Sequence, residues 1–432
     1  MDNITIPQLQ QPFDVTIKIP GCKSITNRVL VIAALADGET VLEEALFSED
    51  TELCVNCLRA LGIPVEADST TKQITIQGQG GQIPADHADL FVGLSGTTAR
   101  FVTALVALGE GRYQFDGIPR MRERPMGDLL TILEQLGTTV NYDGERGFMP
   151  YSMQANRFPG GHLQIDASKT SQQLSGLLMI TPYAQQDTTI QITDKLVSIP
   201  YIDITLQMMR DFGVEATHDN YKRFHIKAGQ RYTSQRYLIE PDASNATYFF
   251  AAAALTGSRI RINHLTSASC QGDAQFVQVL ADMGCQVTVT DSYTELVGPE
   301  QLHGLDIDLN GMSDTVPTLA AIAPFADSPV TIRNVEHIRW KETDRISAVV
   351  TELRRLGATV EAFQDGLKIY PSPLQSAEIE TYNDHRMAMA FSVTGLKVEG
   401  VVIKDPICTH KTYPEFFNQF LDIQNPKGLR NL

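Results

Sequence analysis

The chain has 432 residues, more than a typical single domain, so its length predicts two domains. A hydrophobic content of 43% and a charged content of 20% are typical of a globular protein in water. The formal net charge of −16 argues against nucleic acid and acidic membranes as partners, because binding to either requires a basic surface. Small anions stay possible ligands, provided that basic residues gather in one cleft.

The N-terminal stretch has neither a basic start nor an apolar core, so we expect no signal peptide. No apolar run reaches the roughly 20 residues that cross a bilayer. The 6 cysteines are dispersed, which favours a reducing compartment, and we expect a cytoplasmic protein. Cys54 and Cys57 form a CxxC without a second pair inside a helical pattern, so two cysteines on a helix face are the simpler interpretation.

The first predicted strand is followed by a lysine-containing turn, in the stretch KIPGCKSITNR. A nucleotide-binding P-loop needs glycine directly before the lysine and a second glycine five residues earlier. Here Cys22 precedes Lys23, and the strand before it contains no glycine. We expect a helix from Asn27 to about Ala36, closed by Gly38. The pattern therefore favours an anion site at a helix N-terminus over an ATP site.

A helix end followed by glycine and a strand pattern recurs five times along the chain. The glycines are Gly62, Gly137, Gly213, Gly284 and Gly357, roughly 70–76 residues apart. Glycine is typical of the left-handed residue that ends a helix. Although helix–glycine–strand is common in α/β proteins, a fixed period indicates repeats. Six units would fill the chain, three per domain, and the sixth would end in PEFFNQFLDIQ.

Three stretches in the first half carry groups that could bind anions. The glycine turn at 92–101 offers backbone N–H groups, although a plain helix start is the common alternative. A loop before a helix holds an arginine cluster suited to phosphate or carboxylate, although solvated arginines are commoner. The stretch DASKTSQQ supplies neutral donors, of which helix capping explains one. The arginines and neutral donors are Arg120, Arg122, Arg124, Ser168, Thr170, Ser171 and Gln172.

The second half concentrates charge at four predicted helix starts. Helix capping is the alternative for the aspartate in LNGMSDTVPT, and a salt-bridged helix start is the alternative for KETDR. YNDHRMAM and CTHK add further basic groups. The residues are Asp314, Lys341, Glu342, Asp344, Arg345, His385, Arg386 and Lys411. No zinc or haem spacing is present, so we expect a site without metal.

Together these phrases resemble the 5-enolpyruvylshikimate-3-phosphate (EPSP) synthase family. The match runs from PGCKSITNR to HKTYPEFF in unchanged order, and LVSIPYIDITL, WKETDR and YNDHRMAM are highly specific. The resemblance implies an α/β fold, a two-domain inside-out α/β barrel of six repeated units with the substrate cleft between the domains. It implies one domain of residues 1–20 plus 241–432 and a second of residues 21–240.

The resemblance also implies a reaction. The family transfers the enolpyruvyl group of phosphoenolpyruvate to the 5-hydroxyl of shikimate 3-phosphate by addition and elimination, releasing phosphate. This reaction serves chorismate and aromatic amino acid synthesis and is the target of glyphosate. We accordingly expect a monomer with small-molecule substrates and no cofactor. Proton transfers at a hydroxyl and at a methylene carbon suit two carboxylates near cations.

The resemblance assigns roles to matching positions. Asp314 would be the base for the 5-hydroxyl, and Glu342, near His385, would exchange the proton at the methylene carbon; Lys23 would join them as a catalytic residue. The shikimate 3-phosphate site would comprise Lys23, Ser24, Arg28, Thr170, Ser171, Gln172, Ser198, Asp314, His337 and Lys341. The phosphoenolpyruvate site would comprise Lys23, Gly96, Arg124, Gln172, Arg345, Arg386 and Lys411.

Some positions depart from the family pattern, which leaves substrate affinity and the response to glyphosate open. They are Cys22, Leu94, Phe101, Thr170, His337 and Ile199. One alternative is the related UDP-N-acetylglucosamine enolpyruvyltransferase, but its usual cysteine is missing from the corresponding loop, residues 112–128. A non-catalytic anion-binding paralogue is a third interpretation, which the intact charged residues disfavour.

Overall fold

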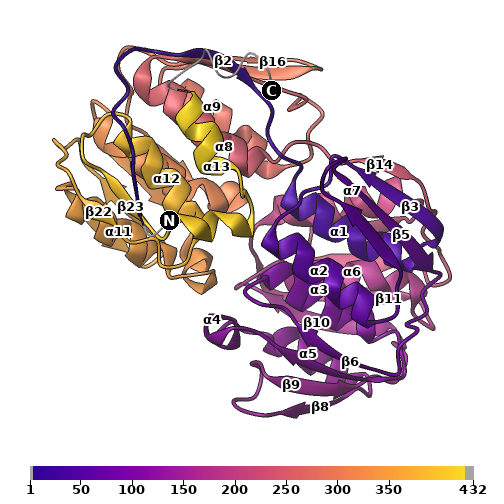
Figure 1. The fold of residues 1–432 in the computed structure, drawn as a ribbon. Helices are drawn as coiled ribbons and strands as arrows, with labels where there is room; N and C mark the ends of the chain where they lie inside the picture. Colours follow the sequence, from indigo (N-terminus) through magenta and orange to yellow (C-terminus); the bar gives the residue numbers. More distant parts are fainter. Residues whose placement is uncertain (1–2, 424–432) are drawn as a thin grey trace. The chain divides into compact units, whose positions relative to one another are not determined.

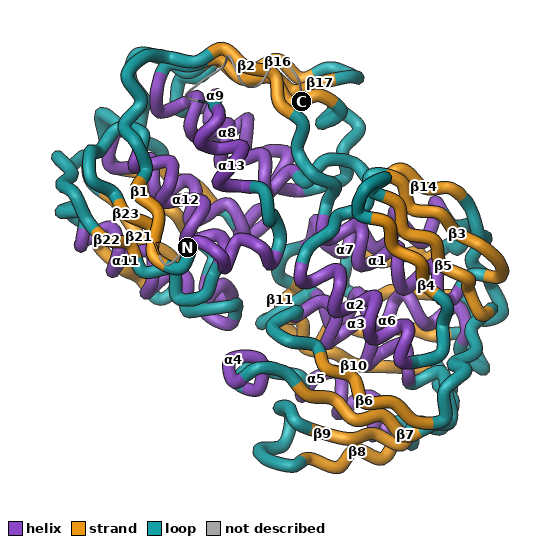
Figure 2. The backbone as a smooth tube through the Cα atoms, in the orientation of Figure 1, coloured by secondary structure: helices purple, strands orange, loops and turns teal. Residues whose placement is uncertain are grey.

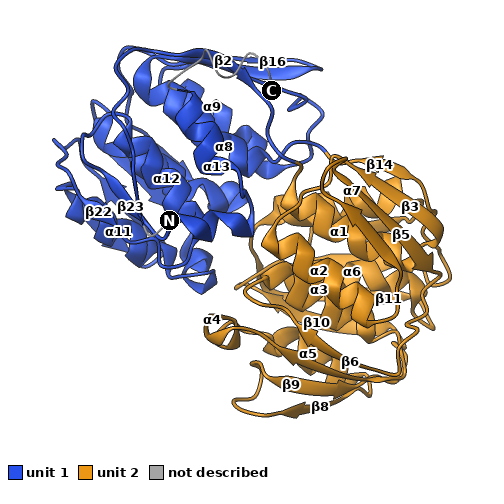
Figure 3. Ribbon diagram, in the orientation of Figure 1, with its two compact units in different colours: residues 1–20, 240–432 blue, residues 21–239 orange. Residues whose placement is uncertain are grey.

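The computed structural model describes residues 3–423 of the chain. Contacts divide the chain into two compact units (Figure 3): unit 1 contains the residues up to Pro20 and from Glu240 onward, and unit 2 runs from Gly21 to Ile239. The return to unit 1 comes one residue before the expected boundary. The N–H of Ile239 donates to the Glu43 carbonyl of unit 2 (2.9 Å), whereas the Glu240 carboxylate accepts a hydrogen bond from Cys270 of unit 1 (3.6 Å).

Each unit is built from three repeats of one pattern: strand, helix, strand, helix, and a closing pair of strands; the repeat that contains β22 and β23 departs from it, because its sheet has three strands and a single closing strand. The first two strands lie parallel and adjacent, the fourth pairs antiparallel with the second, and the third lies at the edge. A parallel pair needs a crossover connection, which the first helix supplies in the four repeats whose first two strands are consecutive in sequence. The α/β class and the six repeats expected from the sequence are thus confirmed.

Three repeats are continuous in sequence. The first comprises β6 (His87–Phe91), α3 (Gly96–Val106), β7 (Arg112–Asp116), α5 (Gly127–Gln135), β8 (Thr139–Tyr142) and β9 (Tyr151–Gln154). The second comprises β10 (Gly161–Ala167), α6 (Gln172–Ile180), β11 (Thr188–Leu196), α7 (Ile199–Asp211), β12 (Ala216–Asp219) and β13 (Arg223–Ile226). The third, in unit 1, comprises β18 (Asp306–Asp308), α10 (Val316–Ile322), β19 (Val330–Arg333), α11 (Arg345–Arg355), β20 (Val360–Phe363) and β21 (Gly366–Ile369).

The other three repeats are completed by strands from distant parts of the chain (Figure 1). β14 (Arg236–Leu238) supplies the first strand for α1 (Lys23–Leu35), β3 (Asp37–Glu43), α2 (Glu49–Ala60), β4 (Val65–Asp68) and β5 (Gln73–Gln79). β2 (Asp14–Ile17) does so for α8 (Ala243–Thr256), β15 (Arg259–Asn263), α9 (Phe276–Asp282), β16 (Gln286–Val289) and β17 (Tyr293–Val297). β1 (Asn3–Thr5) pairs antiparallel with β23 (Val402–Lys404) and so takes the fourth-strand position of the repeat that also contains β22 (Glu378–Ile379), α12 (His385–Gly395) and α13 (Phe416–Asp422).

All five recurring glycines end helices as expected. Gly62 has φ +79° at the end of α2; its N–H donates to the Arg59 carbonyl (2.9 Å), and the N–H of Ile63 donates to Leu58 (3.1 Å). This pair of bonds is the Schellman motif, which satisfies the last carbonyls of a helix. The same pair closes α5, α7, α9 and α11 at the other four glycines, all with positive φ. The sixth repeat ends in α13; Gln424, the last residue of its expected stretch, lies outside the described residues.

The first helix of every repeat is buried in the core, and the sheets lie outside it (Figure 2). In α3 and α12 every residue is buried, and in α8 all but Ser244 are. These helices are largely apolar, and the polar side chains that they carry, such as Arg100 in α3 and Arg386 in α12, are buried and make hydrogen bonds. This is the inside-out arrangement expected above. Within residues 3–423 no helix combines the length and apolar character that a membrane span requires.

The expectation for α1 was wrong at its start and in the role given to Gly38, whereas its end lies within one residue of the expected Ala36. The helix begins at Lys23, because Cys22 is extended and its carbonyl already accepts the N–H of Thr26 (2.9 Å). It ends at Leu35, and Gly38 (φ +100°) instead belongs to β3. The earlier start places Lys23 and Ser24 in the first turn, where backbone N–H groups have no partner inside the helix.

Candidate active site

In unit 2 the N-termini of the three core helices meet. The Nδ2 of Asn27 in α1 donates to Thr97 Oγ1 in α3 (2.8 Å), and Arg28 Nη2 donates to Ser175 Oγ in α6 (3.2 Å). The repeats explain this meeting, because equivalent helices in equivalent positions start at the same end of the unit. Three helix N-termini together offer unsatisfied N–H groups and positive dipole ends to an anion.

Arg28 braces these helices from within. Its side chain is 1% exposed; Nε donates to Thr205 Oγ1 (2.8 Å), Nη1 to the Ser24 carbonyl (2.8 Å) and Nη2 to the Tyr201 carbonyl (3.0 Å). These bonds tie α1 to α7. Lys23 lies one turn earlier, and its Nζ is 3.4 Å from an oxygen of the buried Asp50 carboxylate.

Of the three clustered arginines, only Arg124 is buried. Arg120 pairs with Glu123 (2.6 Å) and Arg122 with Asp116 (2.8 Å), both as exposed surface ion pairs, which is the commoner behaviour considered above. Arg124 is 4% exposed, and its Nη1 donates to the Leu94 carbonyl of the glycine turn (3.1 Å).

The Arg124 guanidinium packs directly on Gly96, the first residue of α3. A Cβ atom at Gly96 would lie 2.5 Å from Arg124 Nη2, closer than such atoms approach. Glycine at this position therefore makes room for the guanidinium at the helix N-terminus.

The start of α6 presents neutral polar groups. The N–H of Gln172 donates to Thr170 Oγ1 (3.2 Å), and Ser171, at the N-cap, makes no side-chain capping bond. The Gln172 Oε1 atom is buried without a hydrogen-bond partner. Ser198 precedes α7 in the left-handed conformation (φ 55°) and is 3% exposed. A buried polar atom without a partner is costly, so it indicates a place for a ligand or water.

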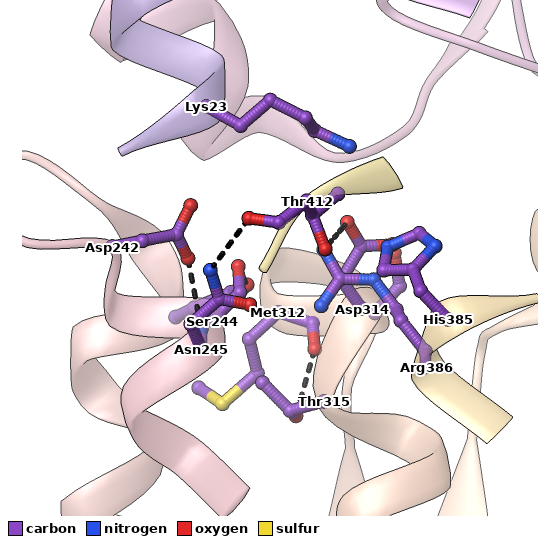
Figure 4. A network of polar contacts seen from close by, with 12 residues as sticks. Lys23, Asp242, Ser244, Asn245, Met312, Asp314, Thr315, His385, Arg386 and Thr412 are labelled. Carbon is purple, nitrogen blue, oxygen red and sulfur yellow. Dashed lines mark hydrogen bonds and ion pairs between the residues drawn. The ribbon is translucent and has the colours of Figure 1, made fainter. Parts of the chain in front are cut away.

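In unit 1 the N-termini of α8, α10 and α12 meet in the same way: Arg386 Nη1 in α12 donates to Tyr248 OH in α8 (3.2 Å), and Thr247 Oγ1 lies 3.2 Å from Thr318 Oγ1 in α10. Figure 4 shows Asp314 and Arg386 pointing toward one another near these helix starts. Asp314 belongs to the short 3-10 helix η3 (Asn310–Thr315) that leads into α10. It is not the N-cap, which is Thr315.

An ion cluster surrounds these helix starts. Arg345, at the start of α11, is 1% exposed; its Nη1 pairs with Asp314 (2.9 Å), its Nη2 with Glu342 (2.9 Å) and its Nε with Asp384 (2.7 Å). Two further cations complete the cluster. Arg386 pairs with the second Asp314 oxygen (2.7 Å), and Lys411 Nζ lies 4.0 Å from Glu342 Oε1.

The cluster therefore alternates three carboxylates with three cations. Burial alone would lower the pKa of Arg345, but the three surrounding carboxylates outweigh it and raise the pKa above its ordinary value. Both oxygens of Asp314 and both of Glu342 face cations, so these two side chains are held in defined orientations.

Two histidines adjoin the cluster. His337 is buried in the 3-10 helix η5 (Glu336–Trp340), and its Nε2 lies 2.9 Å from Ser313 Oγ, next to Asp314. His385 is 1% exposed, with Nδ1 3.6 Å from Asp384 Oδ1, and lies beside Arg386 in the first turn of α12 (Figure 4). Lys341 follows η5 and is half-buried.

The family model for EPSP synthase (3-phosphoshikimate 1-carboxyvinyltransferase) matches residues 7–420. The chain belongs to the EPSP synthase family. The resemblance seen in the sequence is confirmed. A 3-phosphoshikimate 1-carboxyvinyltransferase of Nostoc punctiforme is 62% identical over 98% of the chain and 99% of the relative. One of Yersinia pestis is 45% identical over 94% and 95%.

Solved structures of the family share the fold. EPSP synthase from Acinetobacter baumannii superposes with a TM-score of 0.80 over 98% of both chains, at 23% identity. At this identity the likeness concerns the fold alone. It is the mixed α/β repeat architecture described above.

Among positions expected from EPSP synthase motifs, the structure joins Asp314, Glu342, Arg345, Arg386 and Lys411 in one cluster. The expected site residues of unit 2 lie at or near the N-termini of the core helices α1, α3 and α6 and of α7. Asp344 instead caps α11, accepting the N–H of Ser347 (3.0 Å), and pairs with Arg339, as a salt-bridged helix start would.

Three functional neighbours were missed. Asp384 completes the surroundings of Arg345, and its signal was an aspartate directly before His385 and Arg386 in a family motif. Asp50 beside Lys23, and the buried Asp273 whose carboxylate accepts from Ser244 Oγ in α8, gave no recognisable signal, because their partners are distant in sequence.

Cys54 and Cys57 lie buried in α2, as expected for two cysteines on a helix face. Burial raises the pKa of the Cys54 thiol well above its usual range and that of the Cys57 thiol to about 12, which is typical of core residues.

Proposed function

We propose that this chain transfers the enolpyruvyl group of phosphoenolpyruvate to the 5-hydroxyl of shikimate 3-phosphate, releasing phosphate. The observation that carries the proposal is the unit 1 cluster. Two carboxylates, Asp314 and Glu342, are each held between cations there, and addition followed by elimination needs both proton acceptors and positive charge.

Asp314 is the proposed base for the 5-hydroxyl. Arg345 and Arg386 hold its two oxygens at 2.9 and 2.7 Å, so its orientation is set before substrate arrives. Glu342 is the proposed group that gives and takes the proton at the methylene carbon, together with the buried His385. Lys23 would stabilise charge on the reacting phosphate ester.

Both substrates carry a phosphate and a carboxylate, which unit 2 is suited to bind. Lys23, Ser24 and Gln172 lie in the first turns of core helices, where backbone N–H groups can donate to an anion. Gln172 Oε1, an acceptor without a partner, is suited to a substrate hydroxyl. We assign shikimate 3-phosphate to these groups with Arg28, Thr170, Ser171, Ser198, His337 and Lys341. Phosphoenolpyruvate is assigned to Lys23, Gly96, Arg124, Gln172, Arg345, Arg386 and Lys411.

The sugar-nucleotide enolpyruvyltransferase is the second candidate. The loop at residues 112–128 holds no cysteine, which disfavours it. An assay of phosphate release from phosphoenolpyruvate separates the two. We expect release with shikimate 3-phosphate and none with UDP-N-acetylglucosamine; the opposite result would reverse the proposal.

The same assay tests the roles. Asp314→Asn and Glu342→Gln should lose most turnover and keep measurable ligand binding. Lys23→Ala and Arg386→Ala should weaken donor binding by about 1.5–3 kcal/mol each, the value of a charge-assisted hydrogen bond. Full turnover by the Asp314 variant would refute its assignment as base.

A further inference from the structure

A strained turn leads directly into the active-site helix α12. Tyr382 and Asn383 have φ of 56° and 52°, and the N–H of Asp384 donates to the Thr381 carbonyl (2.9 Å). Two successive positive φ values are typical of type I′ turns, where asparagine and glycine are preferred. A tyrosine in the left-handed region costs about 1–2 kcal/mol. The turn therefore needs an outside support to persist.

The support is the carboxylate of Glu352, in the last turns of α11. Glu352 is 0% exposed; its Oε1 accepts from Tyr382 OH (2.6 Å) and its Oε2 from the N–H of Glu380 (3.1 Å). Burial and the adjacent Glu352 carboxylate raise the pKa of Tyr382 to about 12, so the phenol keeps its proton at neutral pH and remains a donor. Arg355 Nε lies 3.0 Å from Glu352 Oε2 and balances its charge.

One face of α11 holds the turn at both ends. Arg345 and Glu352 are seven residues apart, which is two helical turns and places them on the same face. Arg345 pairs with Asp384, the N-cap of α12, while Glu352 holds Glu380 and Tyr382. The segment between these points has little freedom, and Arg386 follows it immediately, with its N–H bonded to Asp384 Oδ1 (3.0 Å).

We propose that Glu352 is a positioning residue of the active site, which acts by holding the Thr381–Asp384 turn. Without this hold, Tyr382 can leave the left-handed region, and Asp384 and the first turn of α12 then shift. Arg386 and Arg345, which depend on Asp384 and Asp314 for their orientation, lose their alignment. The inference rests on the proposed function and deepens it, since both arginines are assigned to phosphoenolpyruvate.

The test compares Tyr382→Phe and Glu352→Gln with a matched control. In the same unit the half-buried Tyr370 donates its OH to Oε1 of the exposed Glu361 at the same 2.6 Å, so Tyr370→Phe removes a bond of equal length that supports no turn. We expect both turn variants to raise KM for phosphoenolpyruvate by roughly fivefold to twentyfold, the effect of one hydrogen bond from the partly exposed Tyr382 to the buried, charged Glu352. KM for shikimate 3-phosphate should change less than about twofold, and Tyr370→Phe should change neither constant.

A second variant separates positioning from folding. Asparagine accepts the left-handed region more easily than tyrosine, so Glu352→Gln combined with Tyr382→Asn should recover part of the lost donor affinity. Unchanged KM in folded Tyr382→Phe, or no recovery in the double variant, would overturn the proposal. If the wild-type protein lacks the activity, the proposed function fails separately. Amide hydrogen exchange over residues 380–386 then tests the positioning role of Glu352 without activity. Faster exchange in Tyr382→Phe than in the wild type supports it, and equal exchange refutes it.

Discussion

Replacing Arg345 by methionine tests whether the ion cluster stabilises unit 1. The variant loses a guanidinium that is 1% exposed and pairs with three carboxylates at 2.7–2.9 Å. Asp384, which is 0% exposed, would lose its Arg345 partner. Removing one member of a buried ion pair costs about 3–5 kcal/mol, because the other charge stays buried. We expect a loss near the upper end of this range.

The assay is urea unfolding followed by the fluorescence of Trp340, the single tryptophan, which lies in unit 1 beside Lys341. Arg333→Met is the control, because Arg333 also pairs with a carboxylate, Asp306 (2.6 Å), but both side chains are 55% exposed. An exposed pair contributes about 0–1 kcal/mol. A matching loss below about 1 kcal/mol in both variants would refute the reasoning.

A double variant identifies the cause of the loss. If the penalty is the uncompensated charge of Asp384, then adding Asp384→Asn to Arg345→Met should restore at least half of it. A further loss in the double variant would mean that packing, rather than charge, explains the effect.

Three further predictions concern single positions. Burial and the nearby Asp314 carboxylate raise the pKa of Asp273 to about 7, so it binds its proton more tightly in the folded state than in the unfolded one. The stability that the protonated Asp273 carboxyl contributes is then present below about pH 4 and is lost as the pH rises through 7. Asp273→Asn should therefore stabilise the protein more at pH 8 than at pH 5. An equal change in Tm at the two pH values would contradict this. Gly96→Ala should displace the Arg124 guanidinium, because the added Cβ atom would lie 2.5 Å from it. In steady-state kinetics we expect KM for phosphoenolpyruvate to increase by a larger factor than KM for shikimate 3-phosphate. Gly357→Ala, at φ +90° with no atom closer than 3.6 Å, should cost about 1 kcal/mol of stability in urea unfolding through backbone strain alone.

Site residues that stand in short sequence motifs could be predicted, whereas contacts between residues far apart in the sequence could not. Asp314, Glu342, Arg345 and Arg386 stand in short motifs that identify the family, so they could be named without coordinates. Their pairing could not, because Arg345 and Asp384 are 39 residues apart and their contact leaves no trace in either stretch. Whether Asp314 caps its helix or pairs with arginines was likewise open, since both interpretations fit one aspartate at a helix start.

Local sequence is enough to predict the repeat and the five helix ends at glycine, because the left-handed residue of a Schellman motif depends on neighbours within six positions and favours glycine there. Which strands complete the sheets depends on tertiary structure. β1 pairs with β23 across 401 positions, from Asn3 to Lys404, and backbone hydrogen bonds between strands are the same for any sequence. Partner choice follows from the packing of the buried helices, which no local pattern records.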